Sequence, residues 1–531
     1  MTSNRRAFLK QIGLGAAGMG LFYTGPGSLT AQAAINNQLP RAIPEAQGVS
    51  SVGILAFLEA IGKSKHEFHS FILVRHGQVI AEGWWAPYRA DLNHMLYSMS
   101  KSFTSTAIGF TVAEGRVKVD DLVTSFFPED LPGTVSKNLA ALRVKDLLTM
   151  SVGHAQDSTD AIRATDNWVR TFLALPIQNP PGTAFLYNSG ATYMLSAIVQ
   201  KVTGQKVIDY LKPRLFDPLG IEGMTWDTCP LGINTGGWGL NIQTEGLAKF
   251  GQLYLQKGLW NDRRILTAPW VEEATTFKIQ QPVPANPNPP KEKNDWLQGY
   301  CYQFWRSQHK AYRGDGAFGQ FTIVMPEQDA VLAITSESSS MQGELDLVWE
   351  HLLPAMKAQP LPANASAQAQ LKQKLASLAL LPPKGRTSSP TAGKLSGKSF
   401  VLESNGMNAQ NVTFRFQDGA CLFTLKDDQG EYPIRCGLEK WVTGETTMPG
   451  TPPNLVTARD PKKTNLSKVA ASGTWKDANT FEMTWRFYET PHHDTVTCRF
   501  DGSRVNVTFL NSMAAMNPQG KDKRPVLQGR V

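Results

Sequence analysis

The spacing of apolar residues changes along the chain from a helical period to a strand period. In the first two thirds, Phe103, Ala107 and Phe110 recur every three to four residues, which predicts a helix starting near Ser100. Short apolar runs such as Phe71-Ile72-Leu73-Val74 predict strands around such helices. This part of the chain is therefore expected to be of the α+β class.

Beyond about residue 394 apolar and polar residues alternate, which predicts antiparallel strands. Across the turn Asp501-Gly502 the two strands of one hairpin carry Val496, Cys498 and Phe500 on one side and Val505, Val507 and Phe509 on the other. Between the two parts lies linker-like sequence, including Pro382-Pro383-Lys384-Gly385. We therefore expect a mixed domain over 34–355, a helical and Pro-rich linker over 356–393, and an antiparallel β barrel or sandwich over 394–531.

The first residues carry an export pattern. Arg5-Arg6 precedes an apolar, Gly-rich run from Ile12 to Tyr23 and the small-residue site Ala31-Gln32-Ala33. This order predicts a twin-arginine signal peptide over residues 1–33 and a periplasmic protein. No stretch approaches the roughly 20 apolar residues that a membrane span needs, so stable membrane insertion is not expected.

Composition narrows the function classes further. The chain has 531 residues, 41% hydrophobic and 18% charged, with a formal net charge of +8 that is spread out rather than clustered. Without a Lys/Arg-rich run we expect no nucleic-acid partner. The oligomeric state is left open by the sequence.

Cysteine and histidine usage gives no metal motif. The five cysteines include no Cys-x-x-Cys, so neither a zinc site nor a disulfide framework is indicated, although one pair among Cys421, Cys436 and Cys498 is left open. The run His492-His493-Asp494 is interpreted as a polar hairpin loop, because no third element stands at ligand spacing. We expect no metal and no organic cofactor.

Ser98 and Lys101 are the first candidate catalytic residues. They stand three residues apart where the helix is predicted to begin, so both side chains lie on one side of it. A lysine kept neutral by desolvation can take the proton of a serine hydroxyl, and the helix dipole favours the resulting alkoxide. The same spacing recurs at Ser307 and Lys310, but there it follows a strand-like run, so we interpret that copy as incidental.

Two further motifs follow the first in order. Tyr187-Asn188-Ser189 precedes a helical run, and Gly314-Asp315-Gly316 leads into the strand Phe321-Thr322-Ile323-Val324-Met325. Together with Ser98-Met99-Ser100-Lys101, this order resembles the serine β-lactamase and penicillin-binding protein superfamily, in its class C-like esterase and peptidase branch, over about residues 46–355. The resemblance implies an antiparallel sheet flanked by helices, with a helical subdomain.

The resemblance also implies a role for each motif residue. Ser98 would be acylated, Lys101 would accept its proton, and Tyr187 would pass a proton to the leaving group and activate the deacylating water. The backbone N–H groups of Ser98 and Ala317 would form the oxyanion hole. Substrate would be bound by Gly314, Asp315 and Gly316, and by either Asn188 or Ser189.

The third motif departs from the family pattern, which has Lys-Thr-Gly or His-Thr-Gly at this place. The triplet here has no cation to hold a substrate carboxylate, and Asp315 would repel one. Arg313 is adjacent and could compensate, although neighbouring strand residues point to opposite faces.

These observations predict an exported serine hydrolase that cleaves an ester or amide bond through an acyl-serine intermediate. Two alternatives remain open on the same fold: a β-lactamase or D-amino-acid peptidase acting on cell-wall fragments, and an acyl-binding sensor without turnover. A Ser-His-Asp hydrolase of the α/β type would need Gly-x-Ser-x-Gly, which the sequence lacks.

Overall fold

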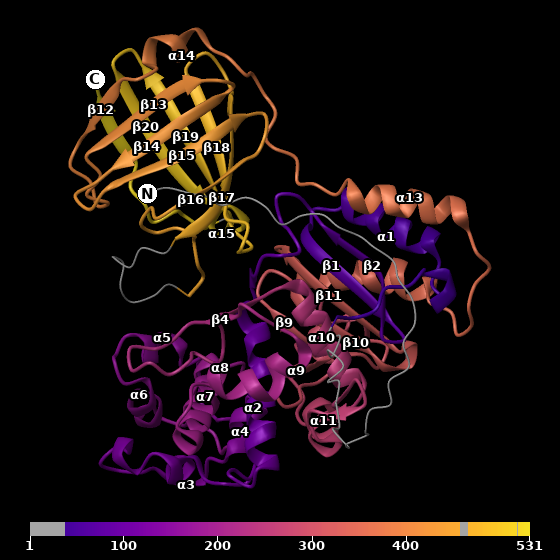
Figure 1. Cartoon of the computed structure of the whole chain (residues 1–531). Coiled ribbons are helices and arrows are strands. Elements are labelled where there is room, and N and C mark those ends of the chain that lie inside the picture. The colour runs from indigo at the N-terminus through magenta and orange to yellow at the C-terminus, as the bar shows by residue number, and fades with distance from the viewer. Residues whose placement is uncertain (1–37, 457–465, 518) are drawn as a thin grey trace, which may run out of the picture. The chain divides into compact units, whose positions relative to one another are not determined.

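The computed structural model describes residues 38–456, 466–517 and 519–531 (Figure 1). The expected signal peptide over residues 1–33 lies outside the described residues. Among the described helices, none has both the length and the apolar character needed to cross a bilayer.

A six-stranded antiparallel sheet organises the first domain, in the order β2-β1-β11-β10-β9-β8. Hairpin β1–β2 comes early in the chain and the other four strands come late, as the apolar runs predicted. The strands are β1 (Glu67–Arg75), β2 (Gln78–Trp84), β8 (Trp305–Arg306), β9 (Tyr312–Gly316), β10 (Gln320–Met325) and β11 (Ala330–Glu337).

Both faces of this sheet are buried, and the two-residue period of β1 assigns its side chains to separate cores. Phe71 and Leu73 pack with helix α1 (Ser51–Lys63) on one face. Ile72 and Val74 pack on the other face, in the core that contains α2 (Ser100–Ala113) and α10 (Thr244–Leu255). The sheet is therefore the middle layer of a three-layer domain.

The helical subdomain lies between hairpin β1–β2 and the late strands. Helix α2 has every side chain from Ser100 to Thr111 buried, and it packs against α7 (Ser189–Thr203). The other helices of this region are α3 (Lys137–Ala141), α4 (Val144–Leu148), α5 (Thr159–Arg163), α6 (Trp168–Ala174), α8 (Val207–Leu211), α9 (Asp217–Leu219) and α11 (Ala268–Thr275).

The segment after the sheet packs on the first domain before it reaches the barrel. After α12 (Met341–Leu347), helix α13 (Ala365–Ala376) lies alongside α1 (Figure 1). Its Leu371, together with Leu378 beyond its end, is buried in the core on that face of the sheet. The expected linker therefore contains one helix with an apolar face of its own.

The C-terminal region is a β barrel, so of the two architectures expected from the sequence the barrel is correct and the sandwich is not. Nine strands close through a parallel contact of β15 with β17, and β16 (Val442–Thr446) adds to the edge of β17. The nine are β12 (Ser399–Leu402), β13 (Asn411–Gln417), β14 (Ala420–Lys426), β15 (Glu431–Leu438), β17 (Ser467–Trp475), β18 (Thr480–Arg486), β19 (His493–Asp501), β20 (Arg504–Asn511) and β21 (Leu527–Arg530). Short helices α14 (Pro390–Leu395) and α15 (Ser512–Met516) accompany them.

The barrel interior is filled by side chains rather than open to a ligand. The alternating residues of the predicted hairpin pair as expected, Phe500 with Val505 and Cys498 with Val507. They join an aromatic core that includes the fully buried Trp475 and Trp485. All five cysteines are buried free thiols.

Candidate active site

Ser98 is presented on a short turn, Tyr97–Met99, that leads directly into α2. Tyr97 has φ of 48°, in the left-handed region that non-glycine residues rarely adopt. The turn leaves Ser98 half-buried, while Lys101, one turn further on, is only 2% exposed. The predicted serine–lysine pair at a helix start is therefore present in the fold.

Lys101 Nζ is surrounded by oxygen atoms at hydrogen-bonding distance. It lies 2.9 Å from Ser98 Oγ, 3.0 Å from Ser189 Oγ and 2.7 Å from the backbone oxygen of Gly237. A neutral amine has two N–H donors and one lone pair. It can donate to Ser189 and Gly237 while its lone pair accepts the Ser98 hydroxyl proton.

Burial makes this neutral form accessible. Desolvation lowers the pKa of Lys101 from 10.5 to about 7, and the nearby carboxylates of Asp157 and Asp315 only partly oppose it. A large fraction of the amine is therefore unprotonated near neutral pH. This is the property that a proton acceptor for serine requires.

Tyr187 has the opposite electrostatic character. Burial, followed by the nearby Asp315 carboxylate, raises its pKa well above the ordinary value, whereas its contact with Ser98 lowers it. Its ring stacks on Trp305 at 5.6 Å between centroids, and Lys101 Nζ lies 4.8 Å from the ring centre. Tyr187 is therefore suited to donate a proton, and Lys101 is suited to accept one.

The structure shows which of Asn188 and Ser189 contacts Lys101, a question that the sequence left open. Asn188 is buried and caps α7, where its side-chain oxygen accepts from the N–H groups of Gly190 and Ala191. Ser189 is half-buried and contacts Lys101. Ser189 is thus the member of the second motif that belongs to the polar cluster, and Asn188 shapes the helix that carries it.

Asp157 and Gly237 complete the cluster, and neither was singled out from the sequence. The exposed Asp157 accepts the Ser189 N–H at 3.1 Å. Gly237 presents its carbonyl to Lys101, and a Cβ there would lie 2.9 Å from the Ser189 carbonyl oxygen. The repeated glycines of Gly236-Gly237-Trp238-Gly239 were the only signal in the sequence for this close approach.

The glycines of the third motif bring β9 against the nucleophile turn. A Cβ at Gly314 would overlap Met99 Sδ and Ser102 Oγ, and one at Gly316 would overlap the carbonyl oxygen of Leu96. Side chains larger than hydrogen would push β9 away from Ser98. Gly314 and Gly316 therefore allow β9 to lie close to the turn that carries Ser98. Because glycine has no side chain, other residues must provide side-chain contacts to a substrate.

Asp315 and Arg313 form an ion pair, which answers the open question of whether Arg313 could compensate for the Asp315 charge. Residues two apart on a strand share a face, and both Nε and Nη2 of Arg313 lie 3.1 Å from Asp315 Oδ2. Burial raises the pKa of Asp315, while the Arg313 guanidinium opposes that rise. The repulsion of a substrate carboxylate by Asp315 is therefore weaker than the sequence implied.

Ala317 stands where the expected oxyanion donor should be. It directly follows β9 in the connection to β10, and the preceding Gly316 touches the Ser98 turn at Leu96 and Met99. The two predicted donors, Ser98 and Ala317, are therefore brought to one corner of the domain. Their role in binding an oxyanion stays a prediction.

The run His492-His493-Asp494 is not a simple polar loop, and this expectation was wrong. His492 and Asp494 are fully buried, and His492 contacts Tyr97 and Glu337 of the first domain. In the described part of the chain, Glu67, Glu337 and His493 come near enough for one cation. However, Arg486 and His69 contact Glu67, and both oxygens of Glu337 face histidines, so the acids are already paired.

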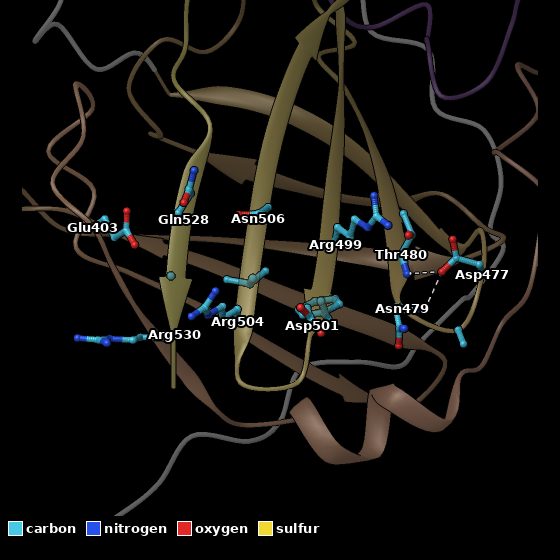
Figure 2. Close-up of a pocket in the computed structure, with 14 residues that line it drawn as sticks. Glu403, Asp477, Asn479, Thr480, Arg499, Asp501, Arg504, Asn506, Gln528 and Arg530 are labelled. Atoms are coloured by element: carbon cyan, nitrogen blue, oxygen red, sulfur yellow. Dashed lines mark hydrogen bonds between the residues drawn. The ribbon is translucent and has the colours of Figure 1, made fainter.

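A polar hollow of about 940 Å³ lies on the barrel, formed by residues of β18 to β21 (Figure 2). Its three arginines, Arg499, Arg504 and Arg530, are exposed and are mixed with acidic and amide side chains. No residue of the three motifs lines it. The arrangement offers no buried polar group that would define a ligand.

Comparison with known proteins finds relatives that match part of this chain. A 6-aminohexanoate-dimer hydrolase from Paenarthrobacter ureafaciens is 28% identical over 223 residues, 38% of this chain and 56% of that protein. A Salmonella schwarzengrund (strain CVM19633) protein named "Putative D-alanyl-D-alanine carboxypeptidase" is 29% identical over 150 residues, 26% of this chain and 35% of its own length. The chain thus spans only about half the length of the first relative and about one third of the length of the second.

Among solved structures, the octameric penicillin-binding protein homologue from Pyrococcus abyssi matches 90% of this chain and 99% of its own, with 15% identity and a TM-score of 0.45. That likeness is too low to carry a functional argument. The family model described as "Beta-lactamase" matches residues 69–356, more than half of the chain. The chain therefore belongs to the β-lactamase family of serine hydrolases.

Proposed function

We propose that this protein cleaves an ester or amide bond through an acyl intermediate on Ser98. The observation that carries the proposal is the buried Lys101 amine, 2.9 Å from Ser98 Oγ and with its pKa lowered to about 7. A serine hydroxyl is a poor nucleophile unless a base takes its proton. The position and the lowered pKa of Lys101 support its role as that base.

The reaction follows from these groups. Ser98 Oγ attacks the carbonyl carbon as its proton moves to Lys101, which gives a tetrahedral oxyanion. The bond to the leaving group then breaks, and the leaving amine or alkoxide takes a proton from Tyr187, which is replenished from Lys101. Water adds to the acyl-serine in the same way, with its proton passing to the base, and releases the acid and Ser98.

We further propose that the preferred substrate carries an ammonium group near the scissile bond. Asp157 is an exposed carboxylate held at the Ser189 N–H, beside the Lys101 cluster. Asp315, by contrast, is buried and already paired with Arg313. The name of the Paenarthrobacter relative, a hydrolase of an aminohexanoate dimer, is in keeping with an amine-bearing amide.

The runner-up is a cell-wall peptidase or β-lactamase, in keeping with the name of the Salmonella relative. Because Arg313 neutralises much of the Asp315 charge, a substrate carboxylate is disfavoured less than the sequence alone implied. We also propose export to the periplasm, on the support of Arg5-Arg6 and the apolar run that follows.

A matched substrate panel tests the proposal. It contains p-nitrophenyl esters and short linear amides, each with and without a free amine, together with D-Ala peptides and a chromogenic cephalosporin. We expect multiple turnovers and a higher kcat/KM for the amine-bearing members, with the preference reduced in Asp157→Asn. A preference for D-Ala peptides or the cephalosporin favours the runner-up, and one acyl group per chain without turnover favours the sensor.

A further inference from the structure

The connection between β18 and β19 of the barrel reaches the turn that carries Ser98. Within this connection His492 is fully buried, and its Nε2 lies 2.6 Å from the hydroxyl of Tyr97, the residue before Ser98. The backbone N–H of Leu455, also in the C-terminal region, donates to the same hydroxyl at 3.2 Å. Two separate segments of the barrel domain thus converge on one atom beside the nucleophile.

Glu337 is the hydrogen-bond partner of the other ring nitrogen of His492. Glu337 ends β11, and its Oε1 lies 2.6 Å from His492 Nδ1. An ionised carboxylate can only accept, so Nδ1 of His492 donates to Glu337. Nε2 shares a hydrogen bond with the Tyr97 hydroxyl, and the phenolic oxygen also accepts from the Leu455 N–H, so each polar group has a partner.

The same histidine touches the other side of the predicted oxyanion hole. Phe318, which follows Ala317, lies with its ring 4.8 Å from the His492 ring and 5.5 Å from the Tyr97 ring. Both Tyr97 and Phe318 have positive φ, 48° and 68°, a backbone region that persists only when the surroundings enforce it. The His492 ring therefore packs against the residues next to both predicted donors, Ser98 and Ala317.

Attachment of the barrel does not by itself need this contact. Arg486 pairs with Glu67, Trp441 Nε1 donates to the Leu380 carbonyl, and the Tyr88 hydroxyl donates to the Thr490 carbonyl. None of these bonds involves the nucleophile turn. The His492–Tyr97 bond is thus available for a function other than holding the two parts together.

We infer that His492 is a positioning residue: the C-terminal barrel supplies it to hold Tyr97 and Phe318, and through them the Ser98 and Ala317 backbone, in the reactive geometry. The inference rests on the proposed acylation of Ser98. Small displacements of a reacting group lower rates strongly, by up to about a hundredfold for about 1 Å. Loss of this bond is therefore expected to slow acylation without removing the nucleophile or the base.

The test is a double-mutant cycle on the full chain, read as the rate constant for labelling of Ser98 by a fluorophosphonate. Tyr97→Phe keeps the ring and removes the hydroxyl, and His492→Ala removes its partner. We expect each variant to label about tenfold more slowly, and the double variant no more slowly than His492→Ala, because the bond between Tyr97 and His492 is lost in all three. With the best substrate, kcat should fall while KM changes little.

His493→Ala is the matched control, since His493 contacts the same Glu337 but not Tyr97. It should label within about twofold of wild type, the ordinary range for residues outside the contact. Wild-type rates in both single variants, or effects that multiply in the double variant, would overturn the inference. If His492→Ala fails to fold, Tyr97→Phe decides alone. Absence of Ser98 labelling in wild type instead refutes the proposed function.

Discussion

The chain contains the spacing Ser-x-x-Lys twice, and the two copies have opposite environments. Lys101 is 2% exposed and contacts Ser98, whereas the Lys310 side chain is 77% exposed and pairs with Glu327 at 2.5 Å. Ser307 is buried, but it accepts a hydrogen bond from Arg313 Nη1 at 2.6 Å. The first copy holds the pair that we propose as nucleophile and base, and the second holds a buried serine near a surface ion pair.

The difference indicates that burial, more than spacing, lowers the pKa of a lysine. At Lys101 desolvation lowers the pKa to about 7, whereas at Lys310 the hydrogen bond that its ammonium donates to Glu327 raises the pKa above its ordinary value. Lys310 therefore stays protonated at any pH where the fold is expected to be stable. Four predictions test this comparison.

The largest effect is expected on covalent labelling. Ser98→Ala should abolish labelling by a fluorophosphonate, because the acylated oxygen is removed, whereas Ser307→Ala should keep one label per chain. Intact-protein mass spectrometry gives the stoichiometry, and peptide mapping gives the position. A labelled peptide containing Ser307 in the wild type would contradict the comparison.

The second largest effect is expected when the lysine of each Ser-x-x-Lys copy is replaced, one at a time. Lys101→Met should lower kcat/KM by about 10² to 10⁴, the usual contribution of a general base, and Lys310→Met should leave it unchanged. Steady-state kinetics with the best substrate of the panel measures both. An equal loss in both variants would show that surface charge matters rather than base catalysis.

The pH dependence of acylation gives a third test. The amine must be unprotonated to accept the serine proton, and the pKa of Lys101 lies at about 7. The labelling rate constant should therefore fall about tenfold per pH unit below that value and become level above it. A rate that continues to rise beyond pH 9 would indicate a base with an unperturbed lysine pKa.

The smallest effect concerns stability. Here replacement of Ser307 should have a larger effect than replacement of Ser98, the reverse of the order expected for labelling. Ser307→Ala removes the shortest of three hydrogen bonds of the buried Arg313 Nη1, which keeps the Asp295 and Arg306 carbonyl oxygens, so unfolding should become easier by about 1 kcal/mol. Ser98 is half-buried, and its replacement should change the free energy of unfolding by less than about 0.5 kcal/mol. Urea unfolding followed by fluorescence measures both. A larger loss in Ser98→Ala would make Ser98 a structural residue as well.

Much of this arrangement was predictable because it depends on local spacing. The i, i+3 relation at a helix start brings Lys101 to Ser98, and alternation predicted the pairing of Cys498 with Val507. Contacts between distant segments were not predictable. His492 and Tyr97 are 395 residues apart, and the exposed Asp157 lies outside any helix or strand pattern.

The order of the three motifs can be read directly from the chain, and the alternation that builds the barrel and the closeness of Ser98 to Lys101 follow from backbone periodicity. The lowered pKa of Lys101 arises from the folded arrangement, because desolvation depends on the elements that surround this side chain. The fold also pairs Arg313 with Asp315 and brings the barrel to Tyr97. Solvation and electrostatic interactions depend on distances in space, which cannot be read from separations along the chain.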